Sequence, residues 1–170
     1  MPGPVISRAR IIDAPAQRIF DLLADPAAHA RFDGSGSVKA PTNAPARLSS
    51  GARFGMSMKI GAPYKVTNQV VEFEEGRRIA WRHFGGHIWR YELEPVQDGK
   101  ATRVIETFDG RPAHAPFVSR ALGFYRRHPS AIEATLERLA EISRVERVLL
   151  TRSGAPSQPR STKLSSWHRP

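Results

Sequence analysis

Hydrophobic residues recur with helical spacing towards the end of the chain, over residues 129–150. Pro129 and Ser130 are residue types that favour a helix start. The apolar face of this predicted helix holds Ile132, Leu136, Leu139 and Ile142, with Val145 and Leu149 close to it. Charged residues, among them Glu133, Glu137, Arg138, Glu141 and Arg144, take the opposite face. The apolar face needs a partner, and most of the chain before it shows the two-residue alternation of β-strands.

The beginning of the chain predicts one strand and two short helices. Residues 5–12 alternate, and one side of the predicted strand carries Val5, Ser7, Ala9 and Ile11. A helix over residues 15–24 follows, with Asp13 as its expected N-cap. This helix buries Ile19, Phe20, Leu22 and Leu23. Asp25 and Pro26 end it and open a second short helix that continues to Phe32.

Six further strands are predicted between the two helical regions. The first, within residues 37–48, is rich in proline, which a sheet tolerates at its edge. The others cover residues 51–60, 64–75, 79–84, 89–94 and 102–109. The alternation breaks at Val70 and Val71, which predicts a β-bulge. The last strand places Val104, Glu106 and Phe108 on one face.

The turn at Gly85 and Gly86 decides which residues of two neighbouring strands lie opposite each other. A two-residue turn would place Arg82 opposite Trp89 and mix polar and apolar groups on one face. An odd-length loop places Trp81 opposite Tyr91, with His83 opposite Trp89 and Ile79 opposite Leu93. Because the second register gathers the large apolar side chains on one side, we expect an odd-length loop.

Two segments lie outside this strand pattern. Residues 117–125 suggest a helix, which either kinks or restarts at Pro129, because proline cannot donate the next helical hydrogen bond. Residues 151–170 are basic, rich in serine and proline, and aperiodic, so we expect a disordered tail. The predicted folded domain therefore covers residues 1–150.

Several segments together resemble the START-like superfamily, also called SRPBCC, in its polyketide cyclase/dehydrase and lipid-transport branch. They are Ile12-Asp13-Ala14-Pro15, the segment 19–26, the segment 76–82, Tyr91-Glu92-Leu93-Glu94-Pro95, and residues 102–109. The resemblance covers about residues 4–150. It implies an α+β helix-grip fold, in which a curved antiparallel sheet of about seven strands wraps around the long C-terminal helix. It implies no catalytic residue, because its members share a fold without sharing a catalytic motif.

Composition and charge narrow the classes of protein. The chain has 170 residues, of which 40% are hydrophobic and 25% charged, as in a globular domain with one core. It has no cysteine, no apolar run that could span a membrane and no signal-like start, so a cytoplasmic protein is expected. The net charge is +10, and four of these charges lie in residues 151–170, which contain no acidic residue. The body does not interleave basic and aromatic residues as a nucleic-acid stacking platform does, so the sequence does not favour nucleic acid as a partner.

A cavity between sheet and helix is the functional site that the resemblance implies, although the same side chains would also suit a filled core. Its expected lining is Phe54, Met56, Met58, Trp81, His83, Trp89, Tyr91, Glu106 and Phe108, with Phe117, Leu122 or Tyr125 near the mouth. Methionine and aromatic walls suit an adaptable apolar ligand. A hydrophobic small molecule is therefore the expected partner.

Glu106 and His83 are the ionisable residues among these positions, and they are the candidate catalytic residues. They could form a general acid/base pair or orient a phenol or carbonyl. The six histidines lack metal-site spacing and no glycine-rich phosphate loop is present, so no metal and no cofactor are expected. The first interpretation is a binding protein for a lipid, polyketide or aromatic compound. The alternatives are a polyketide aromatase/cyclase or dehydratase that uses the same cavity, and a protein or RNA interaction module. Oligomeric state is left open.

Overall fold

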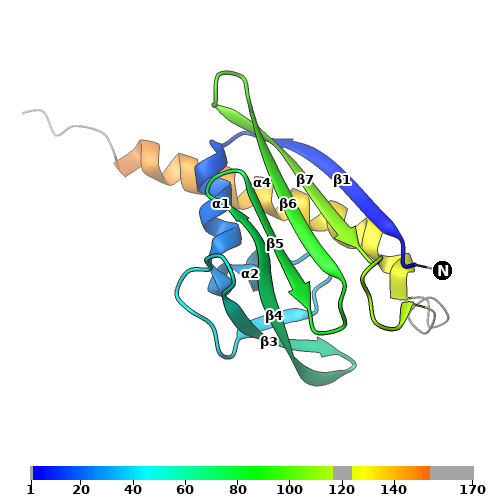
Figure 1. The fold of residues 1–170 in the computed structure, drawn as a ribbon. Helices are drawn as coiled ribbons and strands as arrows, with labels where there is room; N and C mark the ends of the chain where they lie inside the picture. The colour runs from blue at the N-terminus through cyan, green and yellow to red at the C-terminus, as the bar shows by residue number, and fades with distance from the viewer. Residues whose placement is uncertain (1, 117–123, 154–170) are drawn as a thin grey trace, which may run out of the picture.

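The computed structural model describes residues 2–116 and 124–153. One sheet of seven strands lies against a long C-terminal helix, and two short helices connect the first strand to the second (Figure 1). The strands are β1 (Val5–Ile12), β2 (Val38–Pro41), β3 (Arg53–Ile60), β4 (Ala62–Glu74), β5 (Arg78–His83), β6 (Ile88–Val96) and β7 (Ala101–Asp109). The helices are α1 (Ala16–Ala24), the 3-10 turn η1 (Pro26–Ala28), α2 (His29–Phe32), the 3-10 turn η2 (Phe124–Arg127) and α4 (His128–Ser153).

The strand order across the sheet is β1-β7-β6-β5-β4-β3-β2, and all neighbouring strands are antiparallel. The first strand pairs with the last, from Val5 opposite Asp109 to Ile12 opposite Thr102. The chain then crosses the inner face of the sheet through α1 and α2 to reach β2 at the far edge. This confirms the α+β helix-grip arrangement expected from the sequence. Within the described residues, no helix is both long and apolar enough to cross a membrane.

The pairing of β5 with β6 differs from the predicted register by two residues. Trp81 lies opposite Trp89, and Ile79 lies opposite Tyr91. A shift of two residues keeps every side chain on its face of the sheet, because successive side chains alternate. The predicted inner face of both strands is therefore retained, although the individual partners were wrong.

The loop between these strands explains the shift. It has the odd length that was predicted, but its centre is Gly85 rather than Gly86. The amide of His83 donates to the carbonyl of His87 at 2.9 Å, which closes a three-residue loop. Gly86 has φ of 91°, a conformation that favours glycine, and its amide donates to the carbonyl of His83 at 2.8 Å.

Two other strand predictions are settled by the pairing. The register of β4 against β5 shifts between Val70 and Glu72, which confirms the predicted bulge. β2 forms at the sheet edge, as the prolines indicated, but covers only four residues of the predicted segment 37–48.

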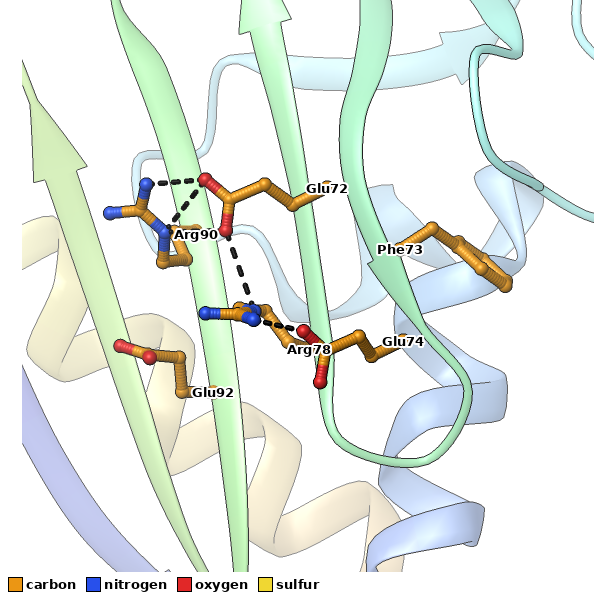
Figure 2. A pocket seen from close by; sticks show the side chains of 6 residues that line it. All are labelled: Glu72, Phe73, Glu74, Arg78, Arg90 and Glu92. Carbon is orange, nitrogen blue, oxygen red and sulfur yellow. Dashed lines mark hydrogen bonds and ion pairs between the residues drawn. The ribbon is translucent and has the colours of Figure 1, made fainter.

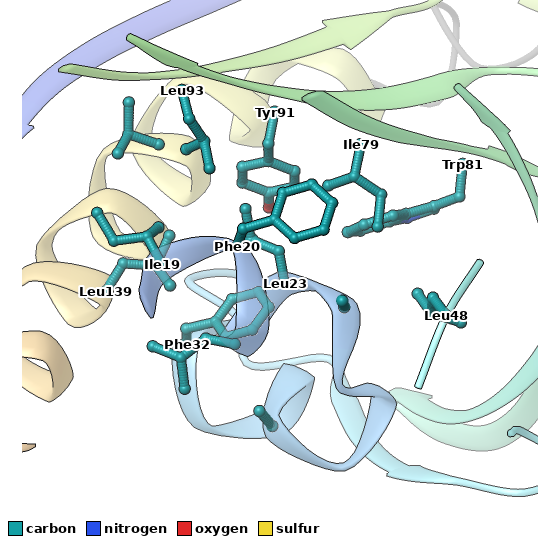
Figure 3. Packing of buried hydrophobic residues seen from close by; sticks show 14 of the residues in the cluster. Ile19, Phe20, Leu23, Phe32, Leu48, Ile79, Trp81, Tyr91, Leu93 and Leu139 are labelled. Carbon is teal, nitrogen blue, oxygen red and sulfur yellow. The ribbon is translucent and has the colours of Figure 1, made fainter. Parts of the chain in front are cut away.

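The hydrophobic core lies between the sheet and the helices. α1 buries the predicted Ile19, Phe20, Leu22 and Leu23, and Figure 3 shows its side chains facing Ile79, Tyr91 and Leu93 of the sheet. In β1, the side that carries Val5 and Ile11 faces solvent, with exposed fractions of 49% and 58%. The opposite side contributes Ile12 to the core, because only that side faces the helix layer.

The N-cap of α1 differs from the prediction. Pro15 occupies the N-cap position, and no side chain caps the helix there. Asp13 lies two residues earlier, and the extended backbone of Pro15 (ψ 146°) already provides the turn into the helix. The second short helix follows as predicted, with the side chain of Asp25 accepting from the amide of Ala27 at 2.8 Å.

α4 packs on the sheet through the first half of its predicted apolar face. Ile132, Leu136 and Leu139 are buried. The expectation for the second half was wrong, since Val145 is 53% exposed and Leu149 57% exposed. The helix extends past the edge of the sheet after its middle (Figure 1), so these side chains have no surface to pack against. It also continues to Ser153, three residues beyond the predicted end.

α4 begins at His128, so Pro129 lies at the start of a helix rather than at a kink within one. The 3-10 turn η2 leads directly into α4, and Pro129 is its second residue, where proline is tolerated. The rest of the predicted helical run, residues 117–123, lies outside the described residues, as does the predicted tail from residue 154 onward.

Candidate ligand cavity

A cavity of about 1480 Å³ lies between the inner face of the sheet and the N-terminal half of α4. Its walls come from β3 to β7, from α2 and the loop after it, and from the first turns of α4. The predicted residues that line it are Phe54, Met56, Met58, Trp81, His83, Trp89, Tyr91 and Glu106. These positions come together because each lies on the inner side of its strand.

Four predicted residues are not part of the described lining. Phe108 is fully buried but lies behind the wall, where its ring packs against His128 at 4.2 Å and Trp89 at 5.0 Å. Tyr125 is half-buried and packs against Phe108 at 5.7 Å, away from the lining. Leu122 and Phe117 fall outside the described residues.

An aromatic cluster that includes His29 forms one wall of the cavity. His29 stacks on Trp81 with ring centroids 5.0 Å apart, and Phe54 meets Trp81 edge-on at 5.8 Å. Burial lowers the pKa of His29, so its imidazole is neutral and can donate from Nε2 to the carbonyl of Leu23 at 2.9 Å. His29 was missed from the sequence because α2 is too short to show helical periodicity. Its contact with Trp81 depends on how that short helix docks on the sheet.

Glu106 is the buried ionisable group of the cavity wall. It lies on β7, only 2% exposed, and the hydroxyl of Tyr91 donates to its Oε1 at 2.9 Å. Its Oε2 is buried and has no hydrogen-bond partner among the residues that the structure describes. Burial raises the pKa of Glu106 well above its ordinary value, and the hydrogen bond from Tyr91 opposes that rise only in part. The arrangement therefore favours a neutral, protonated carboxyl whose proton can be offered to another acceptor.

Three histidines lie near the open end of the cavity. His83 and His87 stack at 4.4 Å, and His128 begins α4 beside them. Burial lowers the pKa of His83 to about 4, of His87 to about 3 and of His128 to about 4. The Nδ1 of His83 accepts from the amide of Gly85 at 3.1 Å. These three histidines are therefore uncharged near neutral pH. No group of histidine, aspartate and glutamate in the described ranges could hold a metal ion.

The loop after α2 closes one side of the cavity against α4. The amide of Gly34 donates to the hydroxyl of Thr135 at 2.9 Å. A Cβ atom at Gly34 would lie 2.1 Å from the carbonyl oxygen of Ala131, and that oxygen belongs to the helix backbone. Glycine is therefore required here for close approach, and the contact fixes the loop against the helix.

A second, open depression on the opposite face of the sheet has a structural explanation. Figure 2 shows its lining of Glu72, Phe73, Glu74, Arg78, Arg90 and Glu92. Arg90 holds Glu72 through two hydrogen bonds from Nε at 3.0 and 3.1 Å, and Arg78 pairs with Glu74. Phe73 turns away into the core, where it meets Phe20. These charges satisfy one another across neighbouring strands, so this depression is an ion-pair network on the outer face rather than a ligand site.

Comparison with known proteins agrees with this fold. The sequence model of the family described as polyketide cyclase/dehydrase and lipid transport matches residues 4–144. An uncharacterized protein of Mycobacterium tuberculosis strain H37Rv, Rv0088, is 38% identical over 147 residues. This match covers 82% of the chain and 64% of that relative, so the chain spans a little less than two thirds of the length of the curated relatives it matches.

Two solved structures illustrate the likeness in fold. The AHSA1-like protein of Aeromonas hydrophila is 22% identical, with a TM-score of 0.58 over 86% of this chain and 95% of that one. The polyketide-cyclase-like protein Cgl2372 of Corynebacterium glutamicum is 20% identical, with a TM-score of 0.55 over 88% and 95% of the two chains. The fold is thus that of the START-like, or SRPBCC, superfamily. Within it, the chain belongs to the polyketide cyclase/dehydrase and lipid transport family.

Proposed function

We propose that this protein binds a hydrophobic small molecule, such as a lipid, a polyketide or another aromatic compound, in the cavity between the sheet and α4. The observation that carries the proposal is Glu106, a buried carboxyl on the cavity wall whose Oε2 has no hydrogen-bond partner in the described part of the chain. The volume of about 1480 Å³ also supports it, because it exceeds the roughly 300–1,000 Å³ of usual small-ligand pockets and so leaves room for such a molecule.

The hydrogen bond between Tyr91 and Glu106 defines what the carboxyl offers to a ligand. The hydroxyl of Tyr91 occupies Oε1, and the raised pKa of Glu106 favours a proton on Oε2. That proton would be donated to a carbonyl or hydroxyl oxygen of the ligand. The aromatic and methionine side chains around it would pack against the ligand's apolar body.

Native mass spectrometry of the protein purified from its own host tests this proposal. We expect a co-purified hydrophobic compound that is absent after denaturation. Isothermal titration with that compound should give nearly unchanged affinity for Glu106→Gln, which keeps a donor. Glu106→Leu should lose roughly tenfold, because a buried hydrogen bond is lost. Glu92→Gln is the matched control, since this residue lies next to Tyr91 but faces the outer side of the sheet. No bound compound, or equal affinity for all three variants, would contradict the proposal.

A polyketide aromatase/cyclase or dehydratase is the second candidate, and the same carboxyl favours it. A protonated carboxyl at a ligand carbonyl is also a general acid. In that case Glu106→Gln should bind substrate normally while turnover falls roughly 10²–10⁴-fold. His83, the other candidate, has a pKa lowered to about 4, so near neutral pH it could accept a proton but holds none to donate as an acid.

A filled interior would have favoured an interaction module, and the cavity argues against that third interpretation.

A further inference from the structure

Exposed hydrophobic side chains gather where the cavity opens. Ile60 is 54% exposed, Tyr64 38% and Phe84 63%, and all three line the cavity. Ile60 and Tyr64 flank the β3–β4 turn, and Phe84 lies in the β5–β6 loop. These two hairpins turn at the same end of the sheet (Figure 1). Exposed apolar side chains grouped at one site commonly mark an interaction surface.

Positive charges surround the same opening. Lys59, Arg126 and Arg127 line the cavity, are exposed, and form no ion pair within the part of the chain that the structure describes. Besides Glu106, the acidic residue of the described cavity lining is the half-buried Asp33, which accepts from the hydroxyl of Ser35 and the amide of Val38.

Some arginines elsewhere on the surface are held in ion pairs. Arg47 pairs with Asp21 and Glu75, and Arg103 pairs with Glu94. Lys59, Arg126 and Arg127 therefore place unpaired positive charge beside the exposed apolar residues of the opening. We define the cavity rim by six residues: Lys59, Ile60, Tyr64, Phe84, Arg126 and Arg127.

We propose that the cavity rim docks on the surface of a bilayer that contains anionic lipid. Apolar side chains on hairpin tips can enter the region between headgroups and acyl chains, while lysine and arginine remain beside the anionic headgroups. Docking there holds the opening of the cavity against the bilayer, so an apolar ligand can pass between the two without crossing water. The docking itself does not depend on the proposed ligand, because it concerns the outer surface of the opening.

Co-sedimentation of the full chain with lipid vesicles tests the docking without any cavity ligand. We expect binding to vesicles of phosphatidylcholine mixed with phosphatidylserine, weaker binding at high salt, and little binding to phosphatidylcholine alone. Replacing Lys59, Arg126 and Arg127 together by alanine should weaken binding roughly a hundredfold, since each cation at an anionic surface contributes about fivefold. Phe84→Ser and Ile60→Ser should each weaken it roughly tenfold.

Matched controls lie at the other end or edge of the sheet. Lys100→Ala removes an exposed cation from the β6–β7 turn, and Ile11→Ser removes an apolar side chain that is 58% exposed on β1. Both should bind vesicles as the wild type does, and circular dichroism should show that all variants are folded. Unchanged vesicle binding in the rim variants would overturn the proposal. Such binding would point to the basic segment after residue 153 instead. Rim-dependent binding of RNA or of an acidic protein, with no vesicle binding, would also overturn it.

Discussion

Glu106 combines deep burial with an ionisable group, so its protonation affects the stability of the whole protein. Its folded pKa is raised well above the ordinary value of 4.5 that it has in the unfolded chain. Between these two values the folded protein keeps the proton and the unfolded chain loses it. The free energy of unfolding therefore falls as pH rises through this window.

The first prediction follows from this linkage. The free energy of unfolding of the wild type should fall by up to about 1.4 kcal/mol per pH unit above the unfolded pKa, relative to Glu106→Gln. Glutamine has no proton to lose, so the two proteins should converge at low pH and diverge as pH rises. Urea denaturation at a series of pH values measures the difference. Parallel profiles would show that the carboxyl is ionised in the folded protein.

Side-chain alternation was sufficient to predict Glu106 on the inner face, because β7 continues regularly through Val104 and Phe108. It could not show that Phe108 lies behind the cavity wall. That position is decided by His128, whose ring covers Phe108 from α4. Contacts of this kind depend on how two elements dock, and no periodicity within either segment records them.

At the scale of elements, the positions of the strands were predicted better than their pairing partners. The positions of the helices were likewise predicted better than the extent of their packed faces. The two-residue period fixed which side of β5 and β6 faces inward, although the turn centre was misplaced by one residue. In α4 the apolar pattern continues through Val145 and Leu149, yet the sheet ends before them. A sequence shows which side chains are able to pack but does not show how far their partner extends.

The second prediction separates the packed and unpacked parts of α4. Leu139→Ala should reduce the free energy of unfolding by roughly 2–5 kcal/mol, because this side chain is fully buried. Val145→Ala and Glu137→Ala should each cost less than about 0.5 kcal/mol, because both positions are exposed. Chemical denaturation of the three variants measures these costs. A large loss at Val145 would mean that the end of α4 packs against another surface in solution.

For the whole molecule, the buried side chains of α4 lie between His128 and Ser143, and the side chains described beyond Ser143 are exposed. We therefore propose that the folded domain is complete by the end of α4 and that residues 154–170 add little to its stability. This segment has no apolar periodicity that would bury a surface.

The third prediction tests this boundary. A chain that ends at Ser153 should melt within about 2 °C of the full chain. A chain that ends before Leu139 is the control, and it should not fold, since it lacks part of the core. Differential scanning calorimetry compares the three. A drop of many degrees on removing residues 154–170 would place a stabilising contact in that segment.

The unpartnered Oε2 of Glu106 also has a consequence for identifying the ligand. A compound that binds the folded protein but not the unfolded chain raises the free energy of unfolding by about 2.7 kcal/mol when its concentration is a hundred times its Kd. For a chain of this size that corresponds to a melting temperature higher by roughly 5–10 °C. Heating the protein with a library of hydrophobic compounds therefore becomes a search method, and Glu106→Leu provides its filter. A compound that stabilises the wild type but not this variant is one that meets the buried carboxyl.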